Sequence, residues 1–152
     1  MCGNRCPGNG LALVCLAVAA LMCLGMGGLG EREVVTKIPR PDRFFNVEVV
    51  DVEDVSFSLR EFSMDGLTLL PVTAGKAQIS LDFAEITEAR FYLQGDRVQA
   101  TVTFKNGSSR DFFMEPDLSF FGLTDWGKVN LEAGDIRRIT FKEQVTHPPA
   151  AD

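Results

Sequence analysis

Residues 97–114 read RVQATVTFKNGSSRDFFM, and this stretch decides the fold class. In its first half apolar residues alternate with polar ones; the apolar set is Val98, Ala100, Val102 and Phe104. A spacing of two is the period of a β-strand with one buried face. Asn106-Gly107 follows, a pair that favours a two-residue hairpin turn in which both residues have positive φ. The pattern therefore predicts an antiparallel hairpin whose second strand runs over 110–114.

Pairs of turn-forming residues divide the rest of the chain into segments of strand length. These pairs are Asp65-Gly66, Ala74-Gly75, Gly95-Asp96, Trp126-Gly127 and Ala133-Gly134. The segments between them show no helical spacing of apolar residues. We therefore expect an all-β domain over 44–142, built from short antiparallel strands.

Within this region the chain repeats itself at a distance of fifty residues. The segment ISLDFAEITEARF at 79–91 aligns without gaps with VNLEAGDIRRITF at 129–141, and Asp65-Gly66 and Asn106-Gly107 are assigned to the upstream hairpins of the two copies. Chance similarity between short β segments is the alternative explanation. We favour a duplicated meander with halves at about 55–91 and 98–141. A second copy then covers the apolar face of the first in a small sandwich or barrel.

The first thirty residues differ in composition from the rest of the chain. They contain all four cysteines but no acidic and no aromatic residue. Arg5, the apolar run 11–24 and the small residues of 25–30 are typical of a signal peptide at 1–30. An uncleaved membrane anchor over 11–29 and a lipid-attached cysteine are the two alternatives.

Two short segments flank the predicted domain. Residues 31–43 contain Pro39 and Pro41, which exclude a helix, and this segment is interpreted as an extended linker or, alternatively, an edge strand. Residues 143–152 lack any apolar period and are interpreted as a disordered tail. The core of the domain must form without disulfides, because no cysteine lies beyond residue 30.

Export is the functional consequence of a signal peptide, and the expected location is the bacterial periplasm or cell surface. The formal net charge of −6 at pH 7 disfavours nucleic acid as a partner, because such binding depends on basic residues that displace counterions. Anionic membrane surfaces are disfavoured for the same reason. Any membrane association is therefore expected through the N-terminal segment alone.

The residue types of the predicted domain point away from catalysis. The only histidine of the chain, His147, lies in the tail, where no scaffold fixes it against a serine. The absence of cysteine beyond residue 30 excludes thiol chemistry and thiolate metal sites. Asp51, Glu53 and Asp54 crowd together but lack the spacing of a calcium loop. The sequence therefore predicts a protein that is not an enzyme and that uses no metal and no cofactor.

One segment, 112–126, is richer in aromatic side chains than any other. It contains Phe112, Phe113, Phe120, Phe121 and Trp126. Neighbouring residues on a strand point to opposite faces, so one ring of each Phe-Phe pair must leave the face that its partner buries. Either the fold covers these rings as well, or they form a contact surface for a protein, a glycan, a lipid or a second copy of the chain.

Together these features favour an exported, non-enzymatic binding or assembly module of the cell envelope that uses residues 112–126 as its contact surface. A tethered structural spacer domain is the first alternative, and an uncleaved leader with fully buried aromatic rings would favour it. A small secreted hydrolase that uses only carboxylates is the second alternative. Such an enzyme requires two acidic side chains close together in a cleft, with a raised pKa.

Overall fold

The structure is a computed structural model of the 152-residue chain, and it describes residues 39–145 except for the side chain at 143. The described residues belong to one compact unit of the chain. The predicted leader, most of the predicted linker and the tail from residue 146 lie outside the described residues. Within the described part, no helix is long and apolar enough to cross a membrane.

The described domain consists of antiparallel strands joined by turns, which confirms the all-β prediction. The strands are β1 (Phe44–Asp51), β2 (Ser56–Met64), β3 (Leu69–Ala74), β4 (Ala77–Asp82), β5 (Ile86–Gln94), β6 (Arg97–Phe104), β7 (Ser109–Met114), β8 (Ser119–Thr124), β9 (Gly127–Glu132) and β10 (Ile136–Val145). Two short 3₁₀ turns, η2 (Phe83–Glu85) and η3 (Ala133–Asp135), precede β5 and β10.

The hairpin of β6 and β7 is present as predicted, and three of the four apolar residues of β6 are fully buried. Its turn differs from the predicted type. Of Asn106 and Gly107, only Gly107 has a positive φ, of 82°. The backbone N–H of Gly107 donates to the carbonyl of Phe104 at 2.9 Å, and the connection covers 105–108 rather than two residues. A hairpin loop of this longer kind needs only one left-handed residue, and Gly107 provides it.

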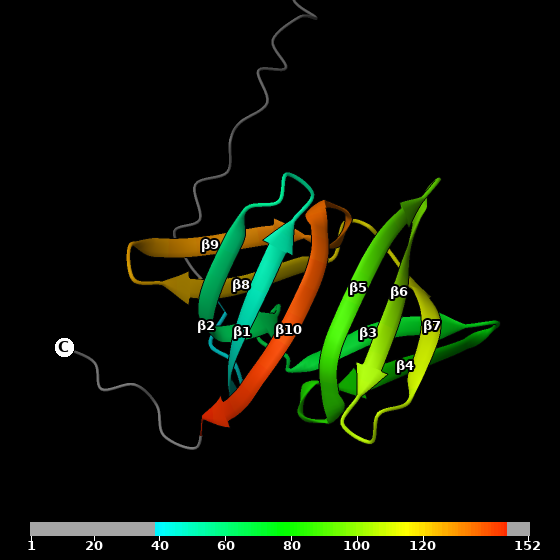
Figure 1. The fold of residues 1–152 in the computed structure, drawn as a ribbon, viewed down its shortest axis with the longest axis horizontal. Coiled ribbons are helices and arrows are strands. Elements are labelled where there is room, and N and C mark those ends of the chain that lie inside the picture. Colours follow the sequence, from blue (N-terminus) through cyan, green and yellow to red (C-terminus); the bar gives the residue numbers. More distant parts are fainter. Residues whose placement is uncertain (1–38, 146–152) are drawn as a thin grey trace, which may run out of the picture. The chain divides into compact units, whose positions relative to one another are not determined.

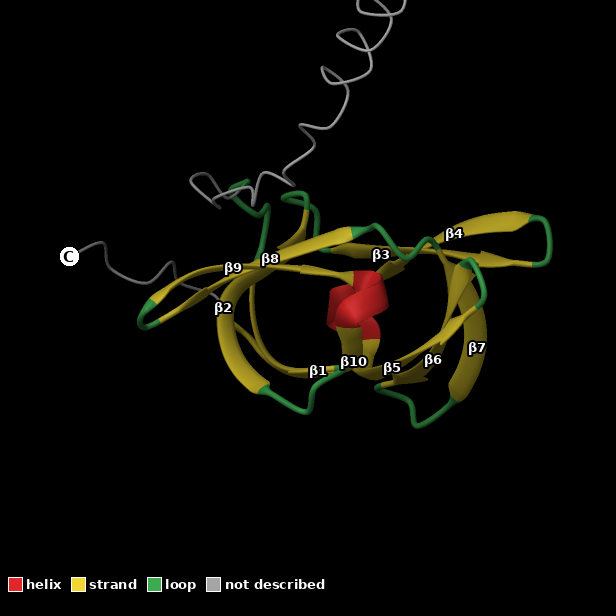
Figure 2. Ribbon diagram, turned by 90° about the horizontal axis from the view of Figure 1, so that it is seen from above, coloured by secondary structure: helices red, strands yellow, loops and turns green. Residues whose placement is uncertain are grey.

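All the strands belong to one ten-stranded sheet with the order β4-β3-β7-β6-β5-β10-β1-β2-β8-β9. The sheet curls into a half-barrel, with β5, β10 and β1 in the middle and both ends turned back over them (Figures 1 and 2). The two 3₁₀ turns lie inside the curl (Figure 2). In the described part of the chain, the end strands β4 and β9 each have a neighbouring strand on one side only.

The sheet is symmetric about its centre. If β1 is exchanged with β6, β2 with β7 and so on to β5 with β10, the same strand order is obtained, read from the opposite end. β5 and β10 are neighbours at the centre, and β4 and β9 occupy the two ends. Backbone hydrogen bonds recur in the same way: Phe83 N–H donates to Thr68 at 3.1 Å, and Ala133 N–H donates to Leu118 at 2.9 Å. The repeat therefore includes β1, which lies before the predicted start at residue 55.

The turn of β1 and β2 is the true counterpart of the turn of β6 and β7. Asp54 has a φ of 65° where the second half has Gly107. Asp54 N–H donates to Asp51 at 3.2 Å, as Gly107 donates to Phe104. Asp65-Gly66 lies between β2 and β3. The predicted equivalence of Asp65-Gly66 with Asn106-Gly107 is therefore wrong.

The two halves interlock instead of forming two separate meanders as predicted. β2 of the first half pairs with β8 of the second, and β7 of the second half pairs with β3 of the first. We call β4-β3-β7-β6-β5 the first lobe and β9-β8-β2-β1-β10 the second lobe. The carbonyl of Glu85 accepts from Lys105 N–H, and that of Asp135 accepts from Val52 N–H, both at 2.9 Å. Each 3₁₀ turn thus binds the first hairpin of the other half.

The core lies inside the curl and combines rings from both halves. Phe83 packs with its ring centroid 5.9 Å from Phe45, 5.7 Å from Phe62 and 5.0 Å from Phe141. Phe120 stacks on Phe62 at 5.5 Å. Because these rings come from β1, η2, β2, β8 and β10, burial of the aromatic core depends on both halves folding together.

The domain extends beyond its predicted limits at both ends. Pro41 is buried, and Asp42 N–H donates to the carbonyl of Gly66 at 3.3 Å. At the other end β10 continues to Val145, which pairs with Phe44. The predicted linker therefore ends before residue 41, and residues 143–145 belong to a strand rather than to the tail.

Candidate binding surface

The five aromatic residues predicted as one surface lie in different surroundings. Phe112 and Phe120 are 5% and 1% exposed and belong to the core. Phe113 and Phe121 are half-buried on the opposite face of the same strands, and Trp126 is 75% exposed in the turn between β8 and β9. The expected alternation within each pair is confirmed. A single contact surface made of all five residues is wrong, because one ring of each pair packs inside the curl.

The exposed members also lie in different lobes. Phe113 is on β7 in the first lobe and Trp126 adjoins β8 in the second, and five strands of the sheet separate β7 from β8. The ring of Trp126 lies 6.5 Å from that of Phe57 on β2. The guanidinium of Arg97 lies 4.6 Å from the centre of the Phe113 ring and covers it.

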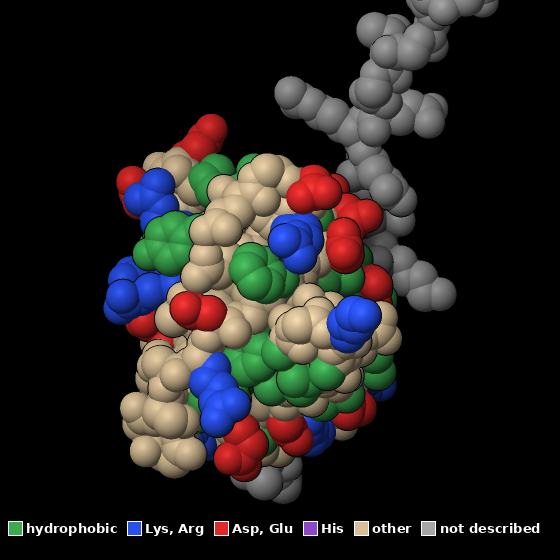
Figure 3. Space-filling model, turned by 90° about the vertical axis from the view of Figure 1, so that its right-hand side faces the viewer, with side chains coloured by type: hydrophobic (Ala, Val, Ile, Leu, Met, Phe, Trp, Pro, Cys, Tyr) green, Lys and Arg blue, Asp and Glu red, His purple; other side chains and the backbone are tan. Residues whose placement is uncertain are grey.

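The first lobe contains an open hollow of about 510 Å³ beside the end strand β4. Its apolar lining consists of Ile79, Leu81, Phe104 and Phe112, and its polar rim of Ser80, Asp82, Glu85, Asn106, Ser108 and Arg110. The rings of Phe104 and Phe112 meet edge to face at 6.5 Å. Hydrophobic side chains gather between charged ones on this side of the molecule (Figure 3). We call this region the β4 hollow.

A second hollow, of about 480 Å³, lies between β3 and β7. These strands pair directly only through Thr73 and Phe113, whose carbonyl also accepts a hydrogen bond from Thr73 Oγ1 at 3.1 Å. Pro71 has no N–H to extend the pairing. The strands part beyond this point, and Phe113, Met114 and Leu118 line the gap. The first part of the predicted contact segment therefore borders both hollows.

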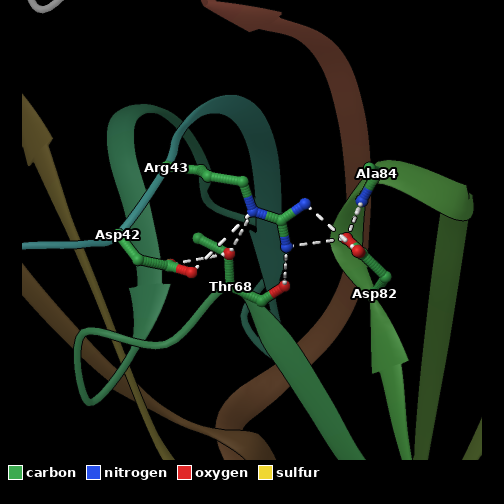
Figure 4. A network of polar contacts seen from close by, with 5 residues as sticks. All are labelled: Asp42, Arg43, Thr68, Asp82 and Ala84. Atoms are coloured by element: carbon green, nitrogen blue, oxygen red, sulfur yellow. Dashed lines mark hydrogen bonds and ion pairs between the residues drawn. The ribbon is translucent and has the colours of Figure 1, made fainter.

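A polar network holds the rim of the β4 hollow in place (Figure 4). The guanidinium of Arg43 donates to both carboxylate oxygens of Asp82, at 2.8 and 3.1 Å, and its Nε donates to Thr68 Oγ1 at 3.0 Å. Thr68 Oγ1 in turn donates to Asp42 at 2.8 Å. The hydrogen bonds from Arg43 hold the pKa of Asp82 below its usual range, and Asp82 raises the pKa of Arg43. Asp82 therefore stays ionised.

The carboxylates that crowd the β1–β2 turn bind the chain itself. Asp51 Oδ1 accepts hydrogen bonds from the N–H groups of Glu53 and Val55, both at 2.9 Å. Asp54 forms an ion pair with Arg137. Among residues 39–145, no group of three His, Cys, Asp or Glu side chains is placed to hold a metal ion. His147 lies outside the described residues.

The comparison with protein families concerns the described domain. A protein-family model described as "Uncharacterised protein" matches residues 41–144. The chain belongs to this family. No curated protein and no solved structure matches the chain. The family domain begins at the buried Pro41 and ends within β10, so both hollows lie inside it.

Sequence reasoning missed the apolar wall of the β4 hollow. Ile79 and Leu81 alternate with polar residues, which correctly indicates a half-buried strand. The pattern does not show that β4 ends the sheet, which leaves these two side chains only partly covered. Composition could have indicated this wall, because the first five residues of β4 (77–81) contain no charged side chain.

Proposed function

We propose that this protein is an exported, non-enzymatic binding module of the cell envelope that holds a partner protein at the β4 hollow. The observation that carries the proposal is the combination of an apolar hollow with the unpaired edge of a strand. Ile79 and Leu81 are half-buried around the hollow, and within residues 39–145 no strand pairs with the outer side of β4. Exposed apolar surface of this kind marks interaction sites.

The partner that fits is an extended segment of another protein. An end strand presents a row of unpaired N–H and C=O groups, which an added strand satisfies. Proteins commonly protect such edges with charged side chains, especially lysine. β9, at the other end of the sheet, contains Lys128. The only charged residue of β4 is Asp82, and the ion pair with Arg43 neutralises its charge. An apolar side chain of the partner then fills the hollow against Phe104 and Phe112.

Export rests on the composition of the N-terminal thirty residues. The apolar run 11–24 and the small residues before Glu31 support a signal peptide, and an uncleaved anchor over 11–29 is the alternative. Because a signal peptide directs export, the proposed location is the bacterial periplasm or the cell surface, and the alternative is attachment to the membrane through residues 11–29. A binding role needs no catalytic group, in agreement with the residue types of the domain.

A tethered structural spacer is the second candidate function. The burial of Phe112 and Phe120 favours it, because a spacer needs a core but no contact surface. A hydrolase finds less support. Of the two carboxyls at the rim of the β4 hollow, Asp82 and Glu85, Asp82 is paired with Arg43 and has a lowered pKa, whereas a proton donor requires a raised one.

The test uses a photo-crosslinking amino acid in place of Ser80 in the full-length chain inside its own cells. Asn130, the equivalent exposed residue on β9, gives the matched control. We expect one discrete covalent adduct with a protein from position 80 and none from position 130, and we expect Leu81→Ser to remove the adduct. Equal adducts from both positions, or an adduct that persists with Leu81→Ser, contradict the proposed surface. No adduct from either position favours the spacer.

A further inference from the structure

A β-bulge near the start of β10 places two neighbouring arginines on the same face of the sheet. The pairing of β10 with β1 shifts by one residue at Arg137. Arg137 and Arg138 are both exposed, whereas Ile136 and Ile139 on either side are buried. In a regular strand, residues 137 and 138 would point to opposite faces. The bulge therefore brings two cations side by side on the outer face.

A third arginine lies opposite this pair. Arg90 on β5 is the direct cross-strand partner of Arg138. Like charges directly opposite each other destabilise an antiparallel pair. Nε of Arg90 donates to Glu88 at 2.6 Å, and Arg137 pairs with Asp54. The guanidinium of Arg138 has no hydrogen bond and no ion pair within residues 39–145, so the cluster keeps an excess of one positive charge.

The three arginines surround a hollow of about 380 Å³ on the outer face of the sheet. β5 and β10 pair only through 88–90 and 138–140, and beyond this contact the two strands diverge (Figure 1). The hollow opens where they part, and Val50, Asp54 and Tyr92 complete its lining. Tyr92 is 54% exposed, so its ring and hydroxyl are available to a ligand.

The repeat shows that the fold does not require these arginines. The same register shift occurs in β5 between Ile86 and Glu88, where Thr87 stands in the bulge. Thr87 and Glu88 are the residues fifty positions before Arg137 and Arg138, and Thr140 is the counterpart of Arg90. The bulge forms with threonine and glutamate just as it does with two arginines. The cluster of cations therefore calls for an explanation other than folding.

We propose that this hollow, which we call the arginine site, binds a ligand that carries a carboxylate group. A guanidinium matches the two oxygens of a carboxylate and binds them as a fork. One carboxylate balances the single excess charge left at Arg138. Arg138 contacts the carboxylate directly, Arg90 and Arg137 flank it, and the ring of Tyr92 contacts the body of the ligand. The arginine site lies on β5 and β10, apart from the β4 hollow, and does not depend on the function proposed for that hollow.

The chain contains one spectroscopic reporter inside the arginine site and one outside it, because Tyr92 is its only tyrosine and Trp126 its only tryptophan. Biosynthetic labelling with 3-fluorotyrosine and 5-fluorotryptophan gives the full-length chain one ¹⁹F signal in the arginine site and one remote from it. The probes are benzoate, phenyl phosphate and the uncharged benzyl alcohol, at constant ionic strength. We expect benzoate to shift the Tyr92 signal saturably, with no shift at Trp126 and none with benzyl alcohol.

Two single variants separate binding from general surface charge. Arg138→Gln removes the unpaired cation and is expected to weaken benzoate binding about tenfold, because charge-assisted hydrogen bonds contribute on that scale. Lys142→Gln removes a cation four residues along the same strand, where it pairs with Glu48 at 3.5 Å. This control should change the affinity less than about twofold, since it lies outside the hollow. Equal effects of both variants would overturn the site.

The sharpest variant places the residues of the other half at the bulge, as Arg137→Thr with Arg138→Glu. We expect it to keep the Trp126 signal of the native fold, because the same bulge carries Thr87 and Glu88 in β5. We expect it to lose the benzoate response at Tyr92 completely. A linear, unsaturable response of the native chain, or a retained response in this variant, overturns the proposal. Tighter binding of phenyl phosphate than of benzoate overturns the carboxylate assignment.

Discussion

Strands β1–β5 and β6–β10 follow the same order and share two backbone hydrogen bonds at their 3₁₀ turns, but they differ in the side chains that fill equivalent positions. Phe83 in η2 corresponds to Ala133 in η3, and Val72 on β3 corresponds to Gly122 on β8. The shared features are backbone pairing and apolar period. The comparison teaches that these two features specify the repeated fold, whereas the side chains that differ determine how each lobe packs and what it presents to solvent.

The largest effect is expected in the core, at Phe83. Its ring is 1% exposed and contacts three other aromatic rings, whereas the equivalent Ala133 contributes only a methyl group. Phe83→Ala leaves a cavity that the interlocked halves cannot close, and it should lower the free energy of unfolding by about 3–5 kcal/mol. Urea unfolding of the full-length chain measures this loss.

Glu85→Ala gives the control for that experiment. Glu85 lies in the same 3₁₀ turn, but its side chain is exposed, and its carbonyl still accepts from Lys105. Its effect should stay within about 0.5 kcal/mol. A loss below about 1 kcal/mol for Phe83→Ala would mean that the first half contributes no more aromatic packing than the second, which contradicts the comparison.

A smaller effect is expected where the second lobe is tightest, at Gly122. A Cβ added there would lie 2.9 Å from Cβ of Leu59, so β8 approaches β2 too closely for a side chain. Gly122→Val introduces the residue of the first half and should cost about 1–3 kcal/mol through overpacking. Urea unfolding measures the cost. Leu59→Ala keeps that Cβ but removes Cδ1 and Cγ, which lie 3.1 and 3.3 Å from the added Cβ, so the double variant should lose less stability than the sum of the two single losses. Strictly additive losses would show that the two side chains do not interact.

The sequence allowed prediction of those parts of the fold that are local. Alternation over 98–104 predicts a strand because each residue's face follows from its neighbours. The similarity of 79–91 to 129–141 marks two segments that both fold as strand, 3₁₀ turn and strand. The exchange of hairpins between the lobes was not predictable. It depends on pairing between β2 and β8 and between β3 and β7, and no local pattern encodes a partner that far along the chain.

The same limit applies to the candidate sites. Strand alternation correctly predicts that Phe112 and Phe113 face opposite ways, but the cover over each ring depends on where the sheet ends and on Arg97. Adjacent residues of a regular strand point to opposite faces of the sheet, so Arg137 and Arg138 would be expected on opposite faces. Only the register shift against β1, which is a long-range feature, places them together. Asn106-Gly107 indicates a hairpin but suits more than one loop length.

The polar network of the first half has no equivalent with the same residues in the second half, where Leu118 and Glu132 stand at the positions of Thr68 and Asp82. Asp82→Asn removes the ion pair with Arg43 and should lower stability by about 1 kcal/mol near pH 7, because both side chains are partly exposed. Urea unfolding at several pH values measures this difference.

The pH dependence of that loss follows from the lowered pKa of Asp82. Its contribution is fully present above the pKa of an unfolded aspartate, about 3.9, and disappears as the pH falls through the lower folded value. The native chain and Asp82→Asn should therefore converge in stability at the acidic end. Glu132→Gln is the control from the second lobe and should show no comparable gap at pH 7. A gap for Asp82→Asn that does not change with pH would exclude the ion pair as its cause.

The smallest effect is expected at Trp126, the residue that differs most in exposure from the other predicted contact residues. Lys76 occupies the equivalent turn of the first lobe and is also exposed. Trp126→Lys should therefore change the free energy of unfolding by less than about 0.5 kcal/mol. The Trp126 ring contributes little packing, because it is 75% exposed and Phe57 is its only aromatic neighbour within residues 39–145.

The fluorescence of Trp126 gives a second test of its exposure. In a monomer, the emission of this single tryptophan should be red-shifted and readily quenched by acrylamide. Blue-shifted and protected emission from a particle that light scattering shows to be a dimer would mean that a second copy covers the β8–β9 turn, and the two lobes would then differ in their partners as well as in their packing.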